Sequence, residues 1–274
     1  METIKTIKKR YSYASILFKQ LVITEFKLRY QGSVLGYLWS LLKPLLLFTV
    51  MYIVFVRFLR FGEGVEHFAV SLLLGIVLWS FFTEATSMGM RAIADRGDII
   101  RKINFPKYII IIASTTSAFI NLLLNLLVVL VFIIINGVDI QWTILLLPLS
   151  ILQIYILALA IAFLLSAIYV KYRDIGHLWE VFLQGLFYAT PIIYPLALLI
   201  DNASIVVAKV LLLSPPAQII QDARYSTISQ STGTTFGLID NVFIALIPYL
   251  ATLAIGVFAV FYFRKRQKYF AEQV

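Results

Sequence analysis

Residues able to bind charged groups gather in a short basic strip near the N-terminus. The run from Glu25 to Pro44 reads EFKLRYQGSVLGYLWSLLKP, in which Lys27 and Arg29 precede a long apolar stretch. Basic side chains in such a strip can reach the phosphates of membrane lipids. The strip therefore predicts a segment that lies on a membrane surface, followed directly by a segment that enters the membrane.

The remaining polar residues do not form a catalytic or nucleotide-binding motif. None of the 13 glycines is followed by lysine, so the phosphate-binding loop of the GxxxxGK[ST] type is absent. The two histidines, His67 and His177, fall near the ends of different apolar segments, and cysteine is absent. We therefore expect no catalytic site and no metal site in this chain.

Composition indicates that the chain uses lipid as its solvent. Hydrophobic residues make up 61% of the 274 residues and charged residues 14%, against about 45–50% and about 25% in soluble proteins. A net charge of +9 would suggest nucleic acid binding in a soluble chain. Here the basic residues fit the cytoplasmic side of a membrane protein better, so we expect no nucleic acid partner.

The elements that position these residues are predicted to be membrane-spanning helices in an all-α, polytopic protein. A helix crosses a bilayer with about 20 mostly apolar residues. Six segments have this length: Val34–Val56, Phe68–Met88, Tyr108–Ile135, Ile144–Val170, Leu178–Ile200 and Asn241–Phe263. We expect one domain over 1–274, made of an interfacial segment with an amphipathic helix (1–33), the six-span bundle (34–263) and a tail (264–274).

Lysine and arginine residues indicate how this bundle is oriented. With both termini in the cytoplasm, most of the 23 basic residues lie on the inner side, in the N-terminal segment, the loops 89–107 and 171–173, and the tail. The inverted topology would place this excess outside, against the positive-inside rule. The sequence therefore predicts a multi-pass protein with its N-terminal segment and its tail in the cytoplasm.

Prolines interrupt the chain in and after the fifth span. Pro191 and Pro195 each remove a helical hydrogen bond, and the freed carbonyls must be buried in protein or face water. Both a simple kink and a position beside a water-filled path are consistent with this pattern. Further on, Ile205–Leu213 is apolar but too short to cross, and Ser214-Pro215-Pro216 ends it. We expect a re-entrant or surface helix between spans five and six.

Polar and aromatic residues inside the spans are candidates for packing or for function. An aromatic stripe on one face of span one includes Tyr37, Phe48 and Tyr52. Such a stripe serves in core packing, in lipid contact or as a channel wall. Lys43 lies in the same span and can either extend to the interface or serve a function. Asn121 and Asn125 share a helical face and are expected to hydrogen-bond between helices.

Four short motifs occur together along nearly the whole chain. They are Leu28-Arg29-Tyr30 with Ser33 to Trp39 and Pro44 (RY-x-x-S-x-LG-x-LW…P), Ile99-Ile100-Arg101-Lys102 with Phe105-Pro106-Lys107, Tyr172-Arg173-Asp174-Ile175, and Thr190-Pro191-Ile192-Ile193-Tyr194-Pro195. In these residues the chain resembles the membrane permeases of polysaccharide-exporting ABC transporters, which move lipid-linked O-antigen, teichoic acid and related cell-wall glycans. It departs from that family at Ser214-Pro215, where Asn-Pro is more common.

The resemblance implies roles for the candidate residues. Arg29, Tyr30 and Lys43 would serve the lipid headgroup or its gate, although the strip as a plain membrane anchor is an equally open interpretation. A cytoplasmic coupling helix would contact an ATPase through Ile99, Ile100, Arg101, Lys102 and Phe105. The substrate path would be lined by Tyr37, Phe48, Tyr52, Tyr188 and Tyr194, because sugar rings pack on aromatic side chains. Pro191 and Pro195 would break the fifth span.

The resemblance also implies partners and a location. It predicts a homodimer around a shared pore, two copies of a separate ATP-binding subunit that carry ATP and Mg, a lipid-linked polysaccharide substrate, and the cytoplasmic membrane of a bacterium. No cofactor is expected in this chain. The alternatives are an ABC permease for a small drug or lipid, a membrane-embedded transferase, and a secondary transporter. Sparse acidic residues argue against the transferase, and the absence of repeats argues against the secondary transporter.

Overall fold

The computed structural model describes residues 15–25, 27, 32–102 and 105–273, and this part of the chain forms helices and no strand. Residues 15–25 are helical, as predicted for the amphipathic N-terminal segment. The elements that follow are η1 (Gly36–Leu38), α2 (Trp39–Met51), η2 (Tyr52–Phe58), α3 (Phe68–Arg91), η3 (Ala94–Arg96), α4 (Gly97–Lys102), α5 (Tyr108–Ile135), η4 (Trp142–Leu146), α6 (Leu147–Tyr169), α7 (Ile175–Ala189), α8 (Leu196–Asn202), α9 (Ile205–Leu212), α10 (Pro215–Thr227), α11 (Thr235–Leu238), α12 (Val242–Ala245), α13 (Ile247–Arg266), η5 (Gln267–Tyr269) and α14 (Phe270–Gln273).

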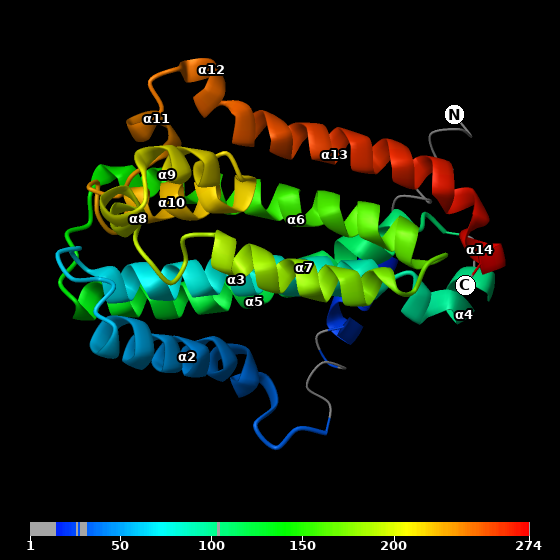
Figure 1. The fold of residues 1–274 in the computed structure, drawn as a ribbon. Coiled ribbons are helices and arrows are strands. Elements are labelled where there is room, and N and C mark those ends of the chain that lie inside the picture. The colour runs from blue at the N-terminus through cyan, green and yellow to red at the C-terminus, as the bar shows by residue number, and fades with distance from the viewer. Residues whose placement is uncertain (1–14, 26, 28–31, 103–104, 274) are drawn as a thin grey trace.

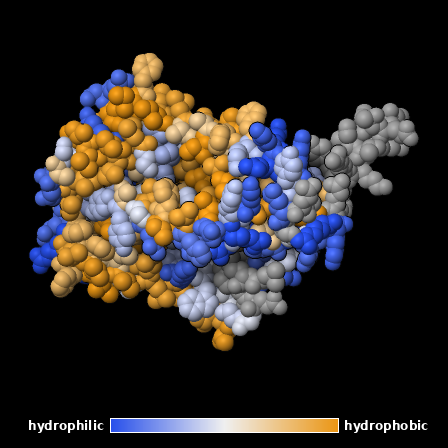
Figure 2. All heavy atoms as spheres, turned by 45° about the vertical axis from the view of Figure 1, so that its right-hand side comes forward, coloured by the Kyte–Doolittle hydropathy of each residue, from blue (hydrophilic) through white to orange (hydrophobic). Residues whose placement is uncertain are grey.

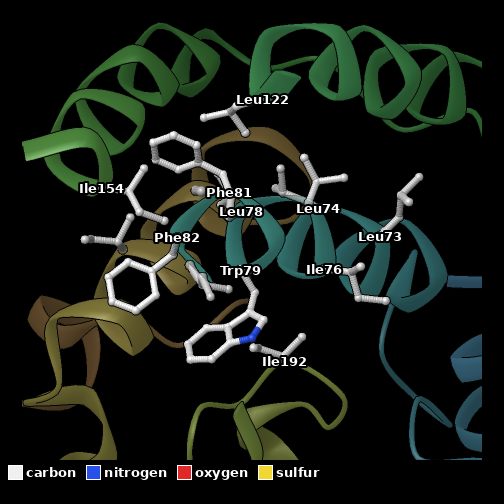
Figure 3. Close-up of a cluster of buried hydrophobic side chains, with 14 of the residues drawn as sticks. Leu73, Leu74, Ile76, Leu78, Trp79, Phe81, Phe82, Leu122, Ile154 and Ile192 are labelled. Carbon is white, nitrogen blue, oxygen red and sulfur yellow. The ribbon is translucent and has the colours of Figure 1, made fainter. Parts of the chain in front are cut away.

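Helix α3 forms the centre of the bundle. Most of its apolar stretch is buried, because α5 and α6 pack along it and α2, α7 and α10 also contact it. Figure 3 shows its side chains pointing outward in several directions, toward Leu122 of α5, Ile154 of α6 and Ile192 of the segment after α7. A helix with apolar residues on several sides is expected at such a central position.

Five helical segments in the described part are long and apolar enough to cross a membrane. They match the predicted first, second, third, fourth and sixth spans, and α5 has the predicted bounds of the third span. The predicted sixth span starts too early, because Val242–Ala245 is a separate turn and Pro248 lies at the start of α13. Figure 2 shows hydrophobic side chains over the flank of the molecule and hydrophilic ones at the end that comes forward.

The predicted fifth span, Leu178–Ile200, is not one continuous helix. Helix α7 has 15 residues, about 22 Å at 1.5 Å per residue, whereas the hydrocarbon core is about 30 Å thick. It starts at the end of the bundle near α4 (Figure 1) and packs against α3 and α6. Residues 190–195 are not helical, and α8 begins after Pro195. The proline break is thus confirmed, and the crossing is a broken one.

Helices α9 and α10 form the predicted element between spans five and six. They meet at an angle of 101°, because Ser214, Pro215 and Pro216 end the first helix and start the second. Figure 1 shows α8, α9 and α10 together at the end of the bundle opposite α4. Helix α10 packs against α6 and η4 there, so the pair caps this end as a re-entrant or surface element.

The end of the bundle that carries α4 has a hydrophobic cluster of its own. Leu21 of the N-terminal helix, Ile100 of α4, Phe105, Phe263 of α13 and Phe270 of α14 are all buried in it. Figure 1 shows the C-terminal helix α14 beside α4 at this end. Three segments that are distant in sequence are therefore fixed to one another where the basic loops gather.

Candidate functional site

A cavity with a volume of about 1070 Å³ lies between α2, α3, α5 and α7. Helix α2 lies at the edge of the bundle (Figure 1) and contacts α3 and α5. Apolar, aromatic and polar side chains all reach the cavity wall. They include Trp39, Ser40, Lys43, Trp79, Glu84, Asn121, Asn125, Phe187 and Tyr188.

One face of α2 lines this cavity. Trp39, Lys43, Leu47 and Met51 recur every four residues, so they lie along the same side of the helix. The Lys43 side chain is exposed to the cavity rather than packed against other helices. The structure therefore places Lys43 at the wall of this cavity, which is where a charged residue within a span has a functional use.

The facing wall carries a carboxylate and two asparagines. Asn121 Nδ2 of α5 donates to Glu84 Oε1 of α3 over 3.0 Å. Asn125 Nδ2 donates to the Ser40 carbonyl of α2 over 3.1 Å and to the Asn121 carbonyl over 2.8 Å. The predicted interhelical bonding of the two asparagines is confirmed. These bonds hold a polar strip at membrane depth, opposite Lys43.

The aromatic residues predicted for the substrate path have different positions. Tyr188 lines the cavity. Phe48 is buried, with its ring edge-on to Phe132 at 5.7 Å and beside Tyr52 at 5.8 Å. Tyr37 is half exposed and lies outside the cavity wall. Within a single chain Phe48 and Tyr52 of the stripe therefore pack against their neighbours, and a role for these two residues and Tyr37 in a path stays a prediction.

Two further predicted residues have clear partners. The Tyr52 hydroxyl accepts a hydrogen bond from Arg57 Nε over 3.1 Å, and the guanidinium lies over the same ring. The Tyr194 hydroxyl donates to the Tyr188 carbonyl over 2.9 Å, which helps to hold the break after α7. Neither Tyr52 nor Tyr194 lines the cavity.

Four aromatic residues of the cavity wall, Trp39, Trp79, Phe81 and Phe187, were not predicted from the sequence to line a path. The rings of Trp79 on α3 and Phe187 on α7 lie 5.8 Å apart, and both line the cavity. The only sequence signal for Trp79 and Phe187 was that each lies inside a predicted span. It could not show that these two side chains reach the cavity, because that depends on how α3 and α7 pack against helices that are distant in sequence.

The coupling segment is only partly exposed. Arg101 and Lys102 at the end of α4 are exposed, and Ile99 is partly buried. Ile100 and Phe105 are 5% and 7% exposed and pack into the chain's own hydrophobic cluster. These two side chains therefore anchor α4 to the bundle, and their contact with an ATPase stays a prediction. Arg29 and Tyr30 lie outside the described residues.

Ion pairs join α3 and η3 to two other elements at this end. Arg91 Nη2 lies 2.8 Å from Glu180 Oε1 of α7, and Arg96 pairs with Glu25 of the N-terminal helix. A smaller cavity of about 370 Å³ lies among these four side chains. The exposed Arg91–Glu180 pair is expected to contribute little stability. The less exposed Arg96–Glu25 pair fixes the N-terminal helix beside the coupling segment.

Lys107 connects the coupling segment to the C-terminal helix. Its Nζ donates to the Gln267 carbonyl over 2.9 Å and lies 5.9 Å from the centre of the Phe270 ring. Partial burial lowers the pKa of Lys107 below its ordinary value, because the ammonium loses water. Among the described residues, no group of three or more histidine and carboxylate side chains is placed to hold a metal ion.

The helical bundle, with its cavity inside a membrane-spanning region, defines a polytopic membrane protein of a transport class. Residues 16–225 match the family model for the ABC-2 type transporter. The chain therefore belongs to the ABC-2 type transporter family and is a permease subunit.

Relatives with known names extend this comparison. The O-antigen export system permease protein RfbA of Myxococcus xanthus is 31% identical over 201 residues, which cover 73% of this chain and 76% of that protein. Two proteins of the same name from Klebsiella pneumoniae are 26% and 25% identical over 193 residues, which cover 69% of this chain and 73% of each relative. These matches agree with the family resemblance in the sequence motifs.

Proposed function

We propose that this chain is the transmembrane subunit of an ATP-driven exporter that moves a lipid-linked polysaccharide across the cytoplasmic membrane. The observation that carries the proposal is the cavity of about 1070 Å³ between α2 and the helices α3, α5 and α7. It combines the lysine of span one with a carboxylate, two asparagines and aromatic rings. The names of the relatives, O-antigen export permeases, support the same substrate class.

The polar and aromatic parts of the cavity wall suit the sugar chain of such a substrate, and the lysine suits its headgroup. Hydroxyl groups of a sugar chain can form hydrogen bonds with Glu84, Asn121 and the Ser40 carbonyl once the present hydrogen bonds of these groups are broken. The aromatic rings of Trp79, Phe187 and Tyr188 offer flat apolar surfaces for sugar C–H groups. Lys43 supplies a positive charge for a headgroup phosphate. Arg29 and Tyr30 are proposed to bind the same headgroup at the membrane surface.

Energy for transport is proposed to come from a separate ATP-binding subunit present in two copies. The chain has no phosphate-binding loop, so ATP and Mg would bind to that partner. The exposed Arg101 and Lys102 on α4, with the partly buried Ile99, are available for the contact. Ile100 and Phe105 would transmit the movement of α4 to the bundle, because both are buried in it.

Assembly is proposed to be a homodimer in the cytoplasmic membrane of a bacterium, with both termini inside. Only 11% of the apolar stretch of the first span is buried in the single chain, which leaves much of its surface for a second copy or for lipid. The arginines and lysines near α4 and α14 favour the cytoplasmic side for that end.

Co-purification tests this proposal. The chain is expressed with its genomic neighbours, purified from membranes, and assayed for ATP hydrolysis with and without extracted lipid-linked glycan. We expect a stoichiometric ATP-binding partner whose activity rises with glycan. We also expect Lys43→Met to lower this stimulation, whereas Lys268→Met at the exposed C-terminal end should leave it unchanged. Stimulation by small drugs or lipids alone, or purification without a partner, would contradict the proposal.

A further inference from the structure

Arg224 is buried at the end of the bundle opposite α4. Its side chain belongs to α10 and the residue is only 2% exposed. Nε donates to the Ser71 carbonyl of α3 over 3.0 Å, Nη1 to the Pro191 carbonyl over 2.6 Å, and Nη2 to the Ile192 carbonyl over 2.7 Å. One guanidinium therefore joins three segments of the chain.

The two carbonyls after α7 need partners from outside their own segment. Proline lacks an N–H and cannot continue the helical pattern, and residues 190–195 are not helical. Gln221 Nε2 of α10 adds a longer bond of 3.4 Å to the Pro191 carbonyl. Helix α10 thus supplies the hydrogen bonds that a continuous fifth span would have made internally.

Space for this guanidinium is provided by a glycine on α3. A Cβ atom at Gly75 would lie 2.7 Å from Arg224 Nη2 and 3.4 Å from Ile192 Cγ2. The ion pairs of the described residues do not include Arg224, so the carbonyl oxygens are its main compensation for burial. A buried cation without a carboxylate depends strongly on the groups that surround it.

The segment that Arg224 holds continues directly into the cavity wall. Phe187 and Tyr188 line the cavity and stand just before the break. Figure 3 shows Ile192 on the same side of α3 as Trp79, whose ring contacts Phe187. Displacement of the break would therefore move the aromatic part of this wall.

We propose that Arg224 is a positioning residue for the transport path, which fixes the break at Pro191 and Ile192 and thereby the end of α7 at the cavity. Whether Arg224 holds the break in place can be measured without any substrate. The link to a transport path rests on the function proposed above.

Thiol labelling in membranes measures whether Arg224 holds the break. The chain has no cysteine, so Ile192→Cys gives a single probe at a fully buried position, and Ile111→Cys gives a buried control on α5 near the other end. With Arg224→Met we expect maleimide to label the thiol at position 192 at least about tenfold faster, because the break opens locally. Labelling at position 111 should not change, and Arg224→Lys should restore part of the protection.

A second variant distinguishes the effect of the guanidinium's position from an effect of the Arg224 substitution on the folding of α10. Gly75→Ala keeps Arg224 but displaces Nη2, so it should also speed labelling at position 192. In the Arg224→Met background the same alanine should add little, because its closest contact is gone. The proposal would be overturned if the thiol at position 192 were labelled no faster in Arg224→Met than with Arg224 present. It would also be overturned if the labelling rates at positions 192 and 111 rose equally.

Glycan-stimulated ATP hydrolysis of the intact complex supplies the functional measurement. We expect Arg224→Met to reduce the stimulation and Arg224→Lys to recover part of it, whereas Arg60→Met, an exposed arginine on a loop, should have no effect. If labelling changes as expected but glycan stimulates ATP hydrolysis in neither the unsubstituted protein nor any variant, the assigned substrate is wrong. The positioning role of Arg224 at the break then stands. Faster labelling together with undiminished stimulation in Arg224→Met would overturn the link to the path.

Discussion

Single polar side chains decide how the helices around the cavity are joined. Asn125 is 6% exposed and donates to carbonyls of both α2 and its own helix. Helix α2 is otherwise weakly covered, so this bond is one of its specific attachments.

Replacement of Asn125 by alanine is expected to loosen α2. The free energy of unfolding in mixed detergent micelles should fall by about 0.6 kcal/mol, and by no more than about 1.7 kcal/mol, the range for interhelical hydrogen bonds in membranes. Asn136→Ala is the matched control, because its exposed amide donates only within its own helix. Equal losses in the two variants would show that the bond to Ser40 does not contribute.

Residue roles were predictable where chemistry is unusual for a membrane span. Lys43 stands out as a charge among apolar residues, and the asparagines stand out by their four-residue spacing; the structure places all three at the cavity. The sequence did not indicate that Phe48 is buried whereas Phe187 lines the cavity. Both are aromatic residues in apolar segments, and which face is buried depends on neighbours that are distant in sequence.

At the scale of whole elements, helix packing depends on small residues at two contrasting positions. A Cβ atom added to Gly89 of α3 would lie 2.4 Å from Ala162 Cβ of α6, where the two helices are in close contact. A Cβ atom added to Gly185 of α7 would meet no atom within 4 Å. The same substitution therefore has opposite consequences at the two sites.

Gly89→Ala should destabilise the protein by about 1–3 kcal/mol, because α3 and α6 must separate or shift. Gly185→Ala should stabilise it by roughly 0.5–1 kcal/mol, since alanine restricts the unfolded chain and suits a helix interior. Thermal unfolding of the purified variants measures both. A gain in stability for Gly89→Ala would contradict the close packing of α3 on α6.

Most spans were predictable because about twenty apolar residues leave few alternatives to a membrane helix. The third span has the predicted bounds, and the proline break is where expected. The burial of Arg224 was not predictable. In the sequence it is one basic residue in a polar loop, and only folding brings it to the carbonyls of Pro191 and Ile192. Helix α4 was found correctly, but the direction of Ile100 depends on α5, α6 and α14.

The whole molecule has two chemically distinct ends. One carries α4, α14 and the basic loops, and the other carries α8 to α12 (Figure 1). The positive-inside rule assigns the first end to the cytoplasm, where an ATP-binding subunit would have to contact Arg101 and Lys102. The orientation in the membrane therefore decides whether the proposed energy source is possible.

Two single-cysteine variants of this cysteine-free chain test the orientation. Ser231 and Lys268 are both exposed, near opposite ends of the bundle. In spheroplasts, an impermeant maleimide should label Ser231→Cys directly and Lys268→Cys only after the membrane is permeabilised. The reverse result would put α4 outside the cell, away from ATP, and the exporter mechanism would then fail even though the helical fold remained correct.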